Sequence, residues 1–254
     1  MIPQEPTLLL ANVFLVGALA SASIASRPKP PQRLAIYYGF PSLVNGSKGD
    51  VGKAAQVFSR YDVVVLGDGL EFDDVDTRRQ PAGAGPDEQR KTRDLISLLR
   101  RSRHPASVYG YITLGNSQKL PLPEIERRAA LWTKMGVQGI FLDEAGYDFG
   151  NTRSRQNAAV EAIHRLGLGA FMNAYRPEDL FSTDRIARNA VGGGNPEGNA
   201  AVLGSKDIFL LESFQVREGQ YEDGTNWYRR TSRAAAYRDQ FGARVFAARA
   251  IPAS

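Results

Sequence analysis

Regular alternation of apolar runs with helical patterns is the sequence feature that most constrains the fold of this chain. Seven short apolar runs predict β-strands, at Leu34–Tyr38, Asp62–Leu66, Ser107–Thr113, Gln138–Leu142, Gly169–Ala174, Ile208–Phe214 and Arg244–Ala248. The stretches between them predict helices, at Val51–Arg60, Asp87–Arg103, Pro123–Met135, Arg153–Leu166, Pro177–Asn189 and Asn226–Phe241. Prolines near the helix starts and glycines after the helix ends support these boundaries.

This alternation is typical of α/β proteins, because consecutive parallel strands are joined by right-handed helical crossovers. Seven strands favour a (β/α)₈ TIM-type barrel over an open doubly wound sheet. The sequence of 254 residues is 43% hydrophobic, which suffices for the core of one large domain. We assign residues 33–254 to this barrel. Because the sequence ends at Ser254, soon after the seventh strand, we expect the C-terminal βα unit to be missing.

The first 32 residues differ in composition from the rest. Residues 1–25 contain the apolar stretch Thr7–Ala20 followed by small residues, and they predict a signal peptide or N-terminal anchor. The stretch is short for a membrane span and has no Lys or Arg before it. Residues 26–32 predict a stiff Pro-rich linker. We therefore expect a secreted or periplasmic protein with no stable membrane span in the mature chain.

Composition excludes several kinds of chemistry. The absence of cysteine excludes disulfides, thiolate nucleophiles and Cys-ligated zinc, and two histidines are too few for a His-rich metal site. His104 precedes a proline and His164 lies in a helical pattern, so neither predicts a Ser-His-Asp triad. The net charge of +5 is spread along helices, which indicates solvated faces and no nucleic-acid partner. We expect no metal and no organic cofactor.

Acidic residues follow two of the predicted strands. Asp143 and Glu144 end the fourth apolar run, and Glu212 lies near the end of the sixth. In α/β barrels the carboxyl ends of the strands form the catalytic cleft, although a single acid there also serves as a helix cap. Paired carboxylates are the groups that cleave glycosidic bonds. Side chains alternate along a strand, so only one of Asp143 and Glu144 faces the barrel axis, and parity alone does not choose between them.

Other strand ends carry aromatic, amide and acidic side chains suited to binding sugar rings and hydroxyls. These candidate substrate-binding residues are Tyr38, Asp68, Tyr111, Asn116, Asn173 and Tyr175. The acidic run after the second strand indicates either a solvated loop or a surface for a cationic sugar polymer. The glycine-rich segment 192–198 lacks the pattern of a phosphate-binding loop, and we interpret it as a loop over the cleft.

Six segments together resemble a known enzyme family: LAIYYG, YDVVVLGDGLE, VYGYITLGN, GVQGIFLDEAGYDFG, FMNAY and FLLESF. They are similar to the spherulin-4-like and endo-α-1,4-polygalactosaminidase-like glycoside hydrolases, over about residues 33 to 250. The resemblance implies a (β/α)₈ barrel acting on an α-linked, partly deacetylated galactosamine-rich exopolysaccharide. It puts the acid of the fourth strand on Asp143, with Glu144 beside it, and the glutamate of the sixth strand on Glu212.

The sequence therefore predicts an exported glycoside hydrolase whose catalytic residues are Asp143 and Glu212, with Glu144 in reserve. Asp143 is the expected nucleophile or base, and Glu212 the expected general acid/base. Two alternatives remain open at this stage. One is a non-catalytic carbohydrate-binding barrel, in which the acids hold amino sugars. The other is a barrel enzyme that binds magnesium through Asp143, Glu144 and Asp68.

Overall fold

The computed structural model describes residues 31–74, 83–213, 216–217 and 220–247. The chain divides into two units, Met1–Pro31 and Gln32–Ser254, and every element described below belongs to the second. The predicted signal peptide or anchor at residues 1–25 lies outside the described residues, as does most of the predicted linker. Within the described part of the chain, no helix combines the length and apolar character needed to cross a membrane.

Strands and helices alternate in the order that the sequence predicts. The strands are β1 (Leu34–Tyr37), β2 (Val63–Leu66), β3 (Ser107–Thr113), β4 (Gly139–Asp143), β5 (Gly169–Ala174), β6 (Ile208–Leu211), β7 (Val216–Arg217), β8 (Gln220–Tyr221) and β9 (Arg244–Ala247). The helices are α1 (Val51–Phe58), α2 (Gly85–Arg101), α3 (Leu122–Met135), α4 (Arg153–Arg165), α5 (Glu178–Phe181) and α6 (Gly224–Phe241), with 3₁₀ turns η1 (Pro41–Gly46) and η2 (Tyr147–Phe149). Gly136 and Gly242 end α3 and α6 in the left-handed conformation.

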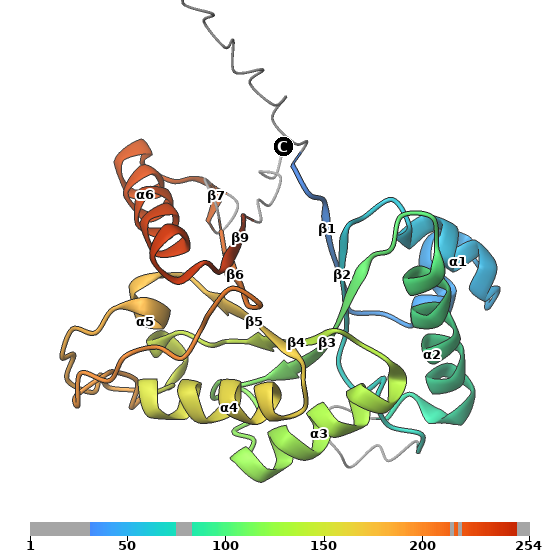
Figure 1. Cartoon of the computed structure of the whole chain (residues 1–254), viewed down its shortest axis with the longest axis horizontal. Coiled ribbons are helices and arrows are strands. Elements are labelled where there is room, and N and C mark those ends of the chain that lie inside the picture. Colours follow the sequence, from blue (N-terminus) through green and yellow to red (C-terminus); the bar gives the residue numbers. More distant parts are fainter. Residues whose placement is uncertain (1–30, 75–82, 214–215, 218–219, 248–254) are drawn as a thin grey trace, which may run out of the picture. The chain divides into compact units, whose positions relative to one another are not determined.

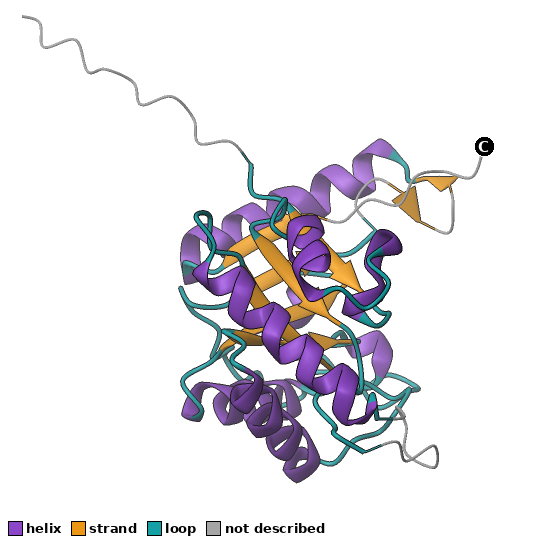
Figure 2. Cartoon of the chain, turned by 90° about the vertical axis from the view of Figure 1, so that its right-hand side faces the viewer, coloured by secondary structure: helices purple, strands orange, loops and turns teal. Residues whose placement is uncertain are grey.

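Seven of the strands form one parallel sheet in the order β1-β2-β3-β4-β5-β6-β9. The sheet curves, and the helices lie along its outer side (Figure 1). The same layering of strands against helices is visible from the side (Figure 2). The short strands β7 and β8 form a separate antiparallel pair between β6 and α6. The predicted fold class is confirmed: the described residues form seven strands of a (β/α)₈-type barrel.

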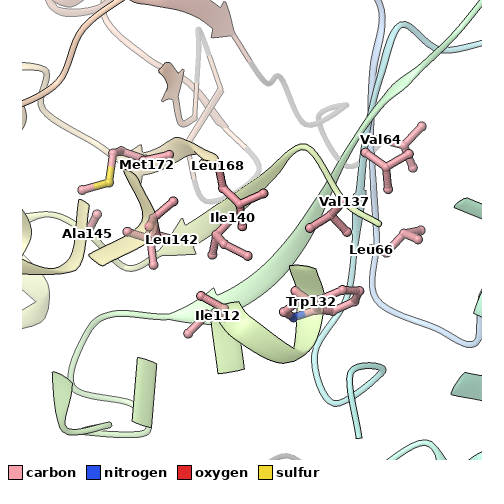
Figure 3. Packing of buried hydrophobic residues seen from close by; sticks show 14 of the residues in the cluster. Val64, Leu66, Ile112, Trp132, Val137, Ile140, Leu142, Ala145, Leu168 and Met172 are labelled. Carbon is pink, nitrogen blue, oxygen red and sulfur yellow. The ribbon is translucent and has the colours of Figure 1, made fainter. Parts of the chain in front are cut away.

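The outer face of the sheet packs against the helices. Every second side chain along a strand points to this side. Examples that are fully buried are Val64, Leu66, Ile140 and Leu142 (Figure 3). Trp132 of α3 packs in the same cluster, over Gly110 of β3. A Cβ at Gly110 would lie 2.2 Å from the indole, so only glycine lets the helix approach here.

The intervening residues form a second core on the inner face of the curved sheet. It is largely aromatic, with Tyr109, Tyr111, Phe141, Phe171 and Phe246 buried together. Phe141 contacts Phe171 edge to face at a centroid distance of 5.0 Å, and stacks on Tyr111 at 5.8 Å. Two residues after Phe141 on β4 comes Asp143, and two residues after Phe171 on β5 comes Asn173. On β6 the inner-face residue is Leu210, and Glu212 follows it just beyond the strand. The inner core therefore supports a layer of polar side chains at the carboxyl ends of the strands.

Two predicted elements are shorter than expected. The helix predicted at Pro177–Asn189 ends at Phe181, because asparagine side chains hold the following segment in loop conformations. Asn189 accepts hydrogen bonds from the amides of Val191 and Gly193, and Ile186 pairs with Asn195 in an antiparallel bridge. The strand predicted at Ile208–Phe214 ends at Leu211, and Ser213 has a left-handed backbone with φ of 51°.

Candidate active site

Asp143 is the last residue of β4, and its carboxylate faces the inner side of the sheet. The Tyr111 hydroxyl donates to Oδ2 at 2.6 Å, and the Asn173 amide donates to Oδ1 at 2.7 Å. The backbone N–H of Glu144 also donates to Oδ1, at 2.8 Å. These donors come from β3, from β5 and from the residue that follows β4, so the carboxyl ends of three adjacent strands fix the orientation of this carboxylate. No Lys or Arg pairs with it among the described residues.

Glu212 follows β6 at the same end of the sheet and is electrostatically coupled to Asp143. Burial raises the pKa of the Glu212 carboxyl above its usual value, and the negative charges of Asp143 and Asp148 raise it further. A hydrogen bond from Asn173 and the charge of Arg230 act in the opposite direction on this pKa. Asn173, which is 6% exposed, therefore contacts both carboxylates, while its Oδ1 has no partner within the described structure.

Arg230 of α6 fixes the backbone that carries Glu212. Its guanidinium donates to the carbonyl oxygens of Glu212 and Tyr175, and to that of Ser213 at 3.4 Å. The side chain is 5% exposed, and its charge is balanced by Glu222 at 3.1 Å. A helix distant in sequence thus holds the turn after β6 in position.

Tyr38 lies beside this carboxylate layer. Its ring contacts Tyr111 edge to face at a centroid distance of 5.5 Å, yet 63% of the side chain is exposed. The surroundings of the hydroxyl raise its pKa, first through desolvation and then through the negative charges of Asp143, Glu212 and Asp68. An exposed aromatic ring next to paired carboxylates is a surface on which a sugar ring can stack.

Glu144 points away from this layer. Its Oε2 accepts the backbone N–H of Ser117 at 3.1 Å, and its carbonyl accepts the side-chain amide of Asn151 at 2.5 Å. Its backbone lies in the left-handed region with φ of 53°, so the chain turns immediately after Asp143. Any side chain at Gly115 would meet Glu144 at 2.6 Å, which explains the glycine there. Glu144 therefore joins the β3 and β4 loops.

Asp68 is engaged in a buried ion cluster. Arg128 of α3 donates to Asp68 at 2.5 Å and to Glu71 at 2.5 Å, and Gln118 donates to Asp68 at 2.6 Å. The side chains of Arg128 and Glu71 are 1% and 0% exposed. Burial raises the pKa of Glu71 to about 7, although Arg128 acts to lower it. Asp68 is therefore tied into the structure at the end of β2.

Two further candidates also have other partners. Asn116 donates to the carbonyl of Val191 at 3.4 Å, linking the β3 loop to the glycine-rich segment. The Tyr175 hydroxyl bonds to Glu222 and accepts from Asn226 at 3.0 Å, so this ring faces α6. Of the sequence-predicted set, the structure brings together Asp143, Glu212, Tyr38, Tyr111 and Asn173. Glu144, Asp68, Asn116 and Tyr175 make contacts elsewhere.

The structure does not bring together the three carboxylates that the magnesium alternative requires. Asp68 is held by Arg128 and Glu144 by Ser117, so these side chains do not converge with Asp143 on one point. Within the described ranges, no three His, Cys, Asp or Glu residues form a group that could hold a metal ion.

Sequence reasoning missed the arginines that organise the site. Arg128 and Arg230 each stand in helical patterns with many other basic residues, and nothing local distinguishes them. The only signal in the sequence is their position: each is flanked by residues that repeat at helical spacing and face the sheet. Arg128 is 60 residues from its partner Asp68 in the sequence, and Arg230 is 18 residues from its partner Glu212.

No model of a known protein family matches this sequence, and no curated protein does. Solved structures with a similar course include the glycoside hydrolase domain of PelA from Pseudomonas aeruginosa, at 14% identity and a TM-score of 0.45 over 86% of this chain and 83% of that one. Aspergillus fumigatus Ega3 in complex with galactosamine aligns at 13% identity and a TM-score of 0.42, over 85% and 77% of the two chains. The citrate synthase SbnG aligns equally well, at 13% identity and a TM-score of 0.45 over 85% and 77%. Since enzymes of unrelated chemistry score alike, the function has to be inferred from the residues of the site.

Proposed function

We propose that this protein is a glycoside hydrolase that cleaves a galactosamine-rich polysaccharide with Asp143 and Glu212. The observation that carries the proposal is a pair of carboxylates at one end of the sheet that are electrostatically coupled and have no ion-pair partner among the described residues. Glu71, by contrast, is buried against the guanidinium of Arg128, which balances its charge.

The two carboxylates suit different roles. Glu212 has a raised pKa, which keeps a proton available for the leaving glycosidic oxygen, as a general acid requires. Asp143 is held by three donors with its oxygens at the strand end, an arrangement suited to a nucleophile or a base that activates water. Asn173 contacts both groups and would preserve their separation through the reaction.

An amino sugar is the substrate class that the charges favour. Asp143, Glu212 and Asp68 place negative charge around the exposed ring of Tyr38. An ammonium group on a sugar stacked at Tyr38 would be attracted to these carboxylates. The sequence motifs that resemble polygalactosaminidases agree with this choice of sugar.

The test is release of reducing ends from a partly deacetylated α-1,4-galactosamine polymer. We expect the unaltered protein to cleave it, and Asp143→Asn and Glu212→Gln to lose about 10²–10⁴-fold in rate, the usual contribution of a positioned acid or base. Glu212→Gln should still bind the polymer. Glu144→Gln is the matched control and should keep its rate within about tenfold, because Glu144 faces Ser117.

Other outcomes separate the alternatives. Polymer binding without any cleavage by the unaltered protein would favour a carbohydrate-binding barrel. Loss of cleavage on addition of a chelator would favour the metal-dependent enzyme. Full activity in Glu212→Gln would remove Glu212 from the mechanism.

A further inference from the structure

A second, oppositely charged site lies on the α6 side of the structure. A cleft of about 490 Å³ opens between the loop after β5 and helix α6. Four of its lining residues are arginines, namely Arg176, Arg229, Arg230 and Arg233. The volume lies within the range of pockets that bind small ligands. One of the lining residues, Tyr175, is two residues after Asn173 of the proposed active site.

Two of the arginines already have carboxylate partners. Arg230 pairs with buried Glu222 at 3.1 Å, and also lies over the Tyr175 ring at 3.6 Å from its centroid. Arg233 faces Glu178 at 3.7 Å, near the upper limit for an ion pair. These two charges are therefore compensated within the protein.

Arg176 and Arg229 are different. Neither forms an ion pair with any residue that the structure describes, and both are exposed, although the charge of Arg176 acts to lower the pKa of Asp179 in the same cleft. Arg229 donates from one nitrogen to Asn226 at 3.1 Å, which orients its guanidinium and leaves its other donors available. The cleft is lined by four arginines and two acids, Glu178 and Asp179, so positive charge is in excess there and a bound anion would be attracted to it.

The rest of the lining defines the shape of the ligand. The exposed side chain of Ile186 gives an apolar wall, and it is 38% accessible. A smaller cavity of about 160 Å³ adjoins through Arg176, Asp179 and Ile186, and reaches Tyr147 and Asp148 after β4. The cleft thus offers guanidinium donors and an apolar wall, with room for one sugar-sized body.

We propose that this cleft binds a sugar-sized ligand bearing an oxyanion, such as the carboxylate of a uronic acid or the phosphate of a sugar phosphate, through Arg176 and Arg229. Guanidinium groups bind both anions through paired N–H donors, so the two sources share one chemistry. Neither Asp143 nor Glu212 lines this cleft, and their negative charges would not favour such a ligand. The protein would accordingly recognise two kinds of sugar at two places.

The experiment is titration calorimetry at low salt with D-galacturonate, D-galactose 6-phosphate, neutral D-galactose and cationic D-galactosamine. We expect at least one of the two anions to bind at least about tenfold more tightly than D-galactose, the factor that one charge-assisted hydrogen bond supplies. Which anion binds more tightly identifies the source of the oxyanion. D-Galactosamine should bind as well to the Arg176→Gln/Arg229→Gln variant as to the unaltered protein.

Arg176→Gln/Arg229→Gln should weaken anion binding by at least about tenfold. Arg238→Gln is the control on the same helix, because Arg238 is exposed and paired with Asp239, and it should leave binding unchanged. Anion binding should also persist in Asp143→Asn, so a failure of the hydrolase proposal would be seen separately. Neither anion binding better than D-galactose, or equal binding by the double variant, would overturn the proposal.

Discussion

Two pairs of acidic residues at the carboxyl ends of the strands have opposite surroundings. At β2, Asp68 and Glu71 share the guanidinium of Arg128 in a buried cluster. At β4 and β6, Asp143 and Glu212 are held by neutral groups, with Tyr111 and Asn173 donating to Asp143. Both pairs follow apolar strand runs and look alike in the sequence.

The difference teaches how to separate structural acids from reactive ones. Removing a cation from a buried cluster leaves uncompensated charge and destabilises the fold. Removing one of two like-charged, unpaired carboxylates relieves repulsion, and the cost appears in activity instead. The β2 acids should therefore report on stability and the β4 and β6 acids on catalysis.

The largest effect is expected at Arg128. Arg128→Met keeps the volume of the side chain but leaves Asp68 and Glu71 without a cation, and it should lower the free energy of unfolding by about 3–5 kcal/mol. Urea unfolding followed by circular dichroism measures this. Arg127→Met, one residue earlier on α3, is the control: Arg127 is exposed and pairs with Glu124, so about 0.5 kcal/mol or less is expected. A change below about 1 kcal/mol in Arg128→Met would contradict the structural role of the cluster.

A smaller effect concerns the pH dependence of stability. The pKa of Glu71 is about 7 in the folded protein, above its usual value, so between these values the folded state binds more protons than the unfolded state. The tighter binding of this proton to folded Glu71 stabilises the folded state. The stabilisation is full below the ordinary glutamate pKa and is lost as the pH rises through 7. Glu71→Gln removes it, so relative to the unaltered protein the variant should gain about 1–3 kcal/mol in unfolding free energy between pH 5 and pH 8.

Urea unfolding of both proteins at each pH checks this. Glu126→Gln serves as the control, because Glu126 is half exposed and pairs with Arg165 at the surface. The control should track the unaltered protein at both pH values. A gap between Glu71→Gln and the unaltered protein that stays constant with pH would show that Glu71 does not titrate in this window.

The smallest effect is expected at Tyr111, which holds Asp143 at the end of β4. Tyr111→Phe removes the hydroxyl that donates to Asp143 while the ring keeps its stacking on Phe141. We expect kcat on the galactosamine polymer to fall about tenfold with KM little changed, and the unfolding free energy to change by about 1 kcal/mol or less. Initial rates over a range of polymer concentrations measure the two constants. A large loss of stability with unchanged kcat would place Tyr111 with the structural residues instead.

The order of strands and helices could be predicted from the sequence, because apolar periodicity, helix-start prolines and helix-end glycines are local signals. The sequence also placed acids after β4 and β6, where a parallel sheet gathers its strand ends. The helix predicted after Pro177 shows where this fails. Asn189 and Asn195 stabilise a loop there through contacts with residues on either side, which a helical pattern does not reveal.

Which acids face one another depends on how the helices pack on the sheet, and the sequence alone does not show this. Alternation puts Phe141 and Asp143 on one face and Leu142 and Glu144 near the other, but which face is inside depends on where the helices pack. Trp132 and the aliphatic side chains cover the Leu142 side, and this leaves Asp143 in the inner layer with Asn173. Likewise, Asp68 is structural only because α3 carries Arg128 to it. Residues so far apart in the sequence come into contact only through tertiary packing, and local sequence patterns do not predict such contacts.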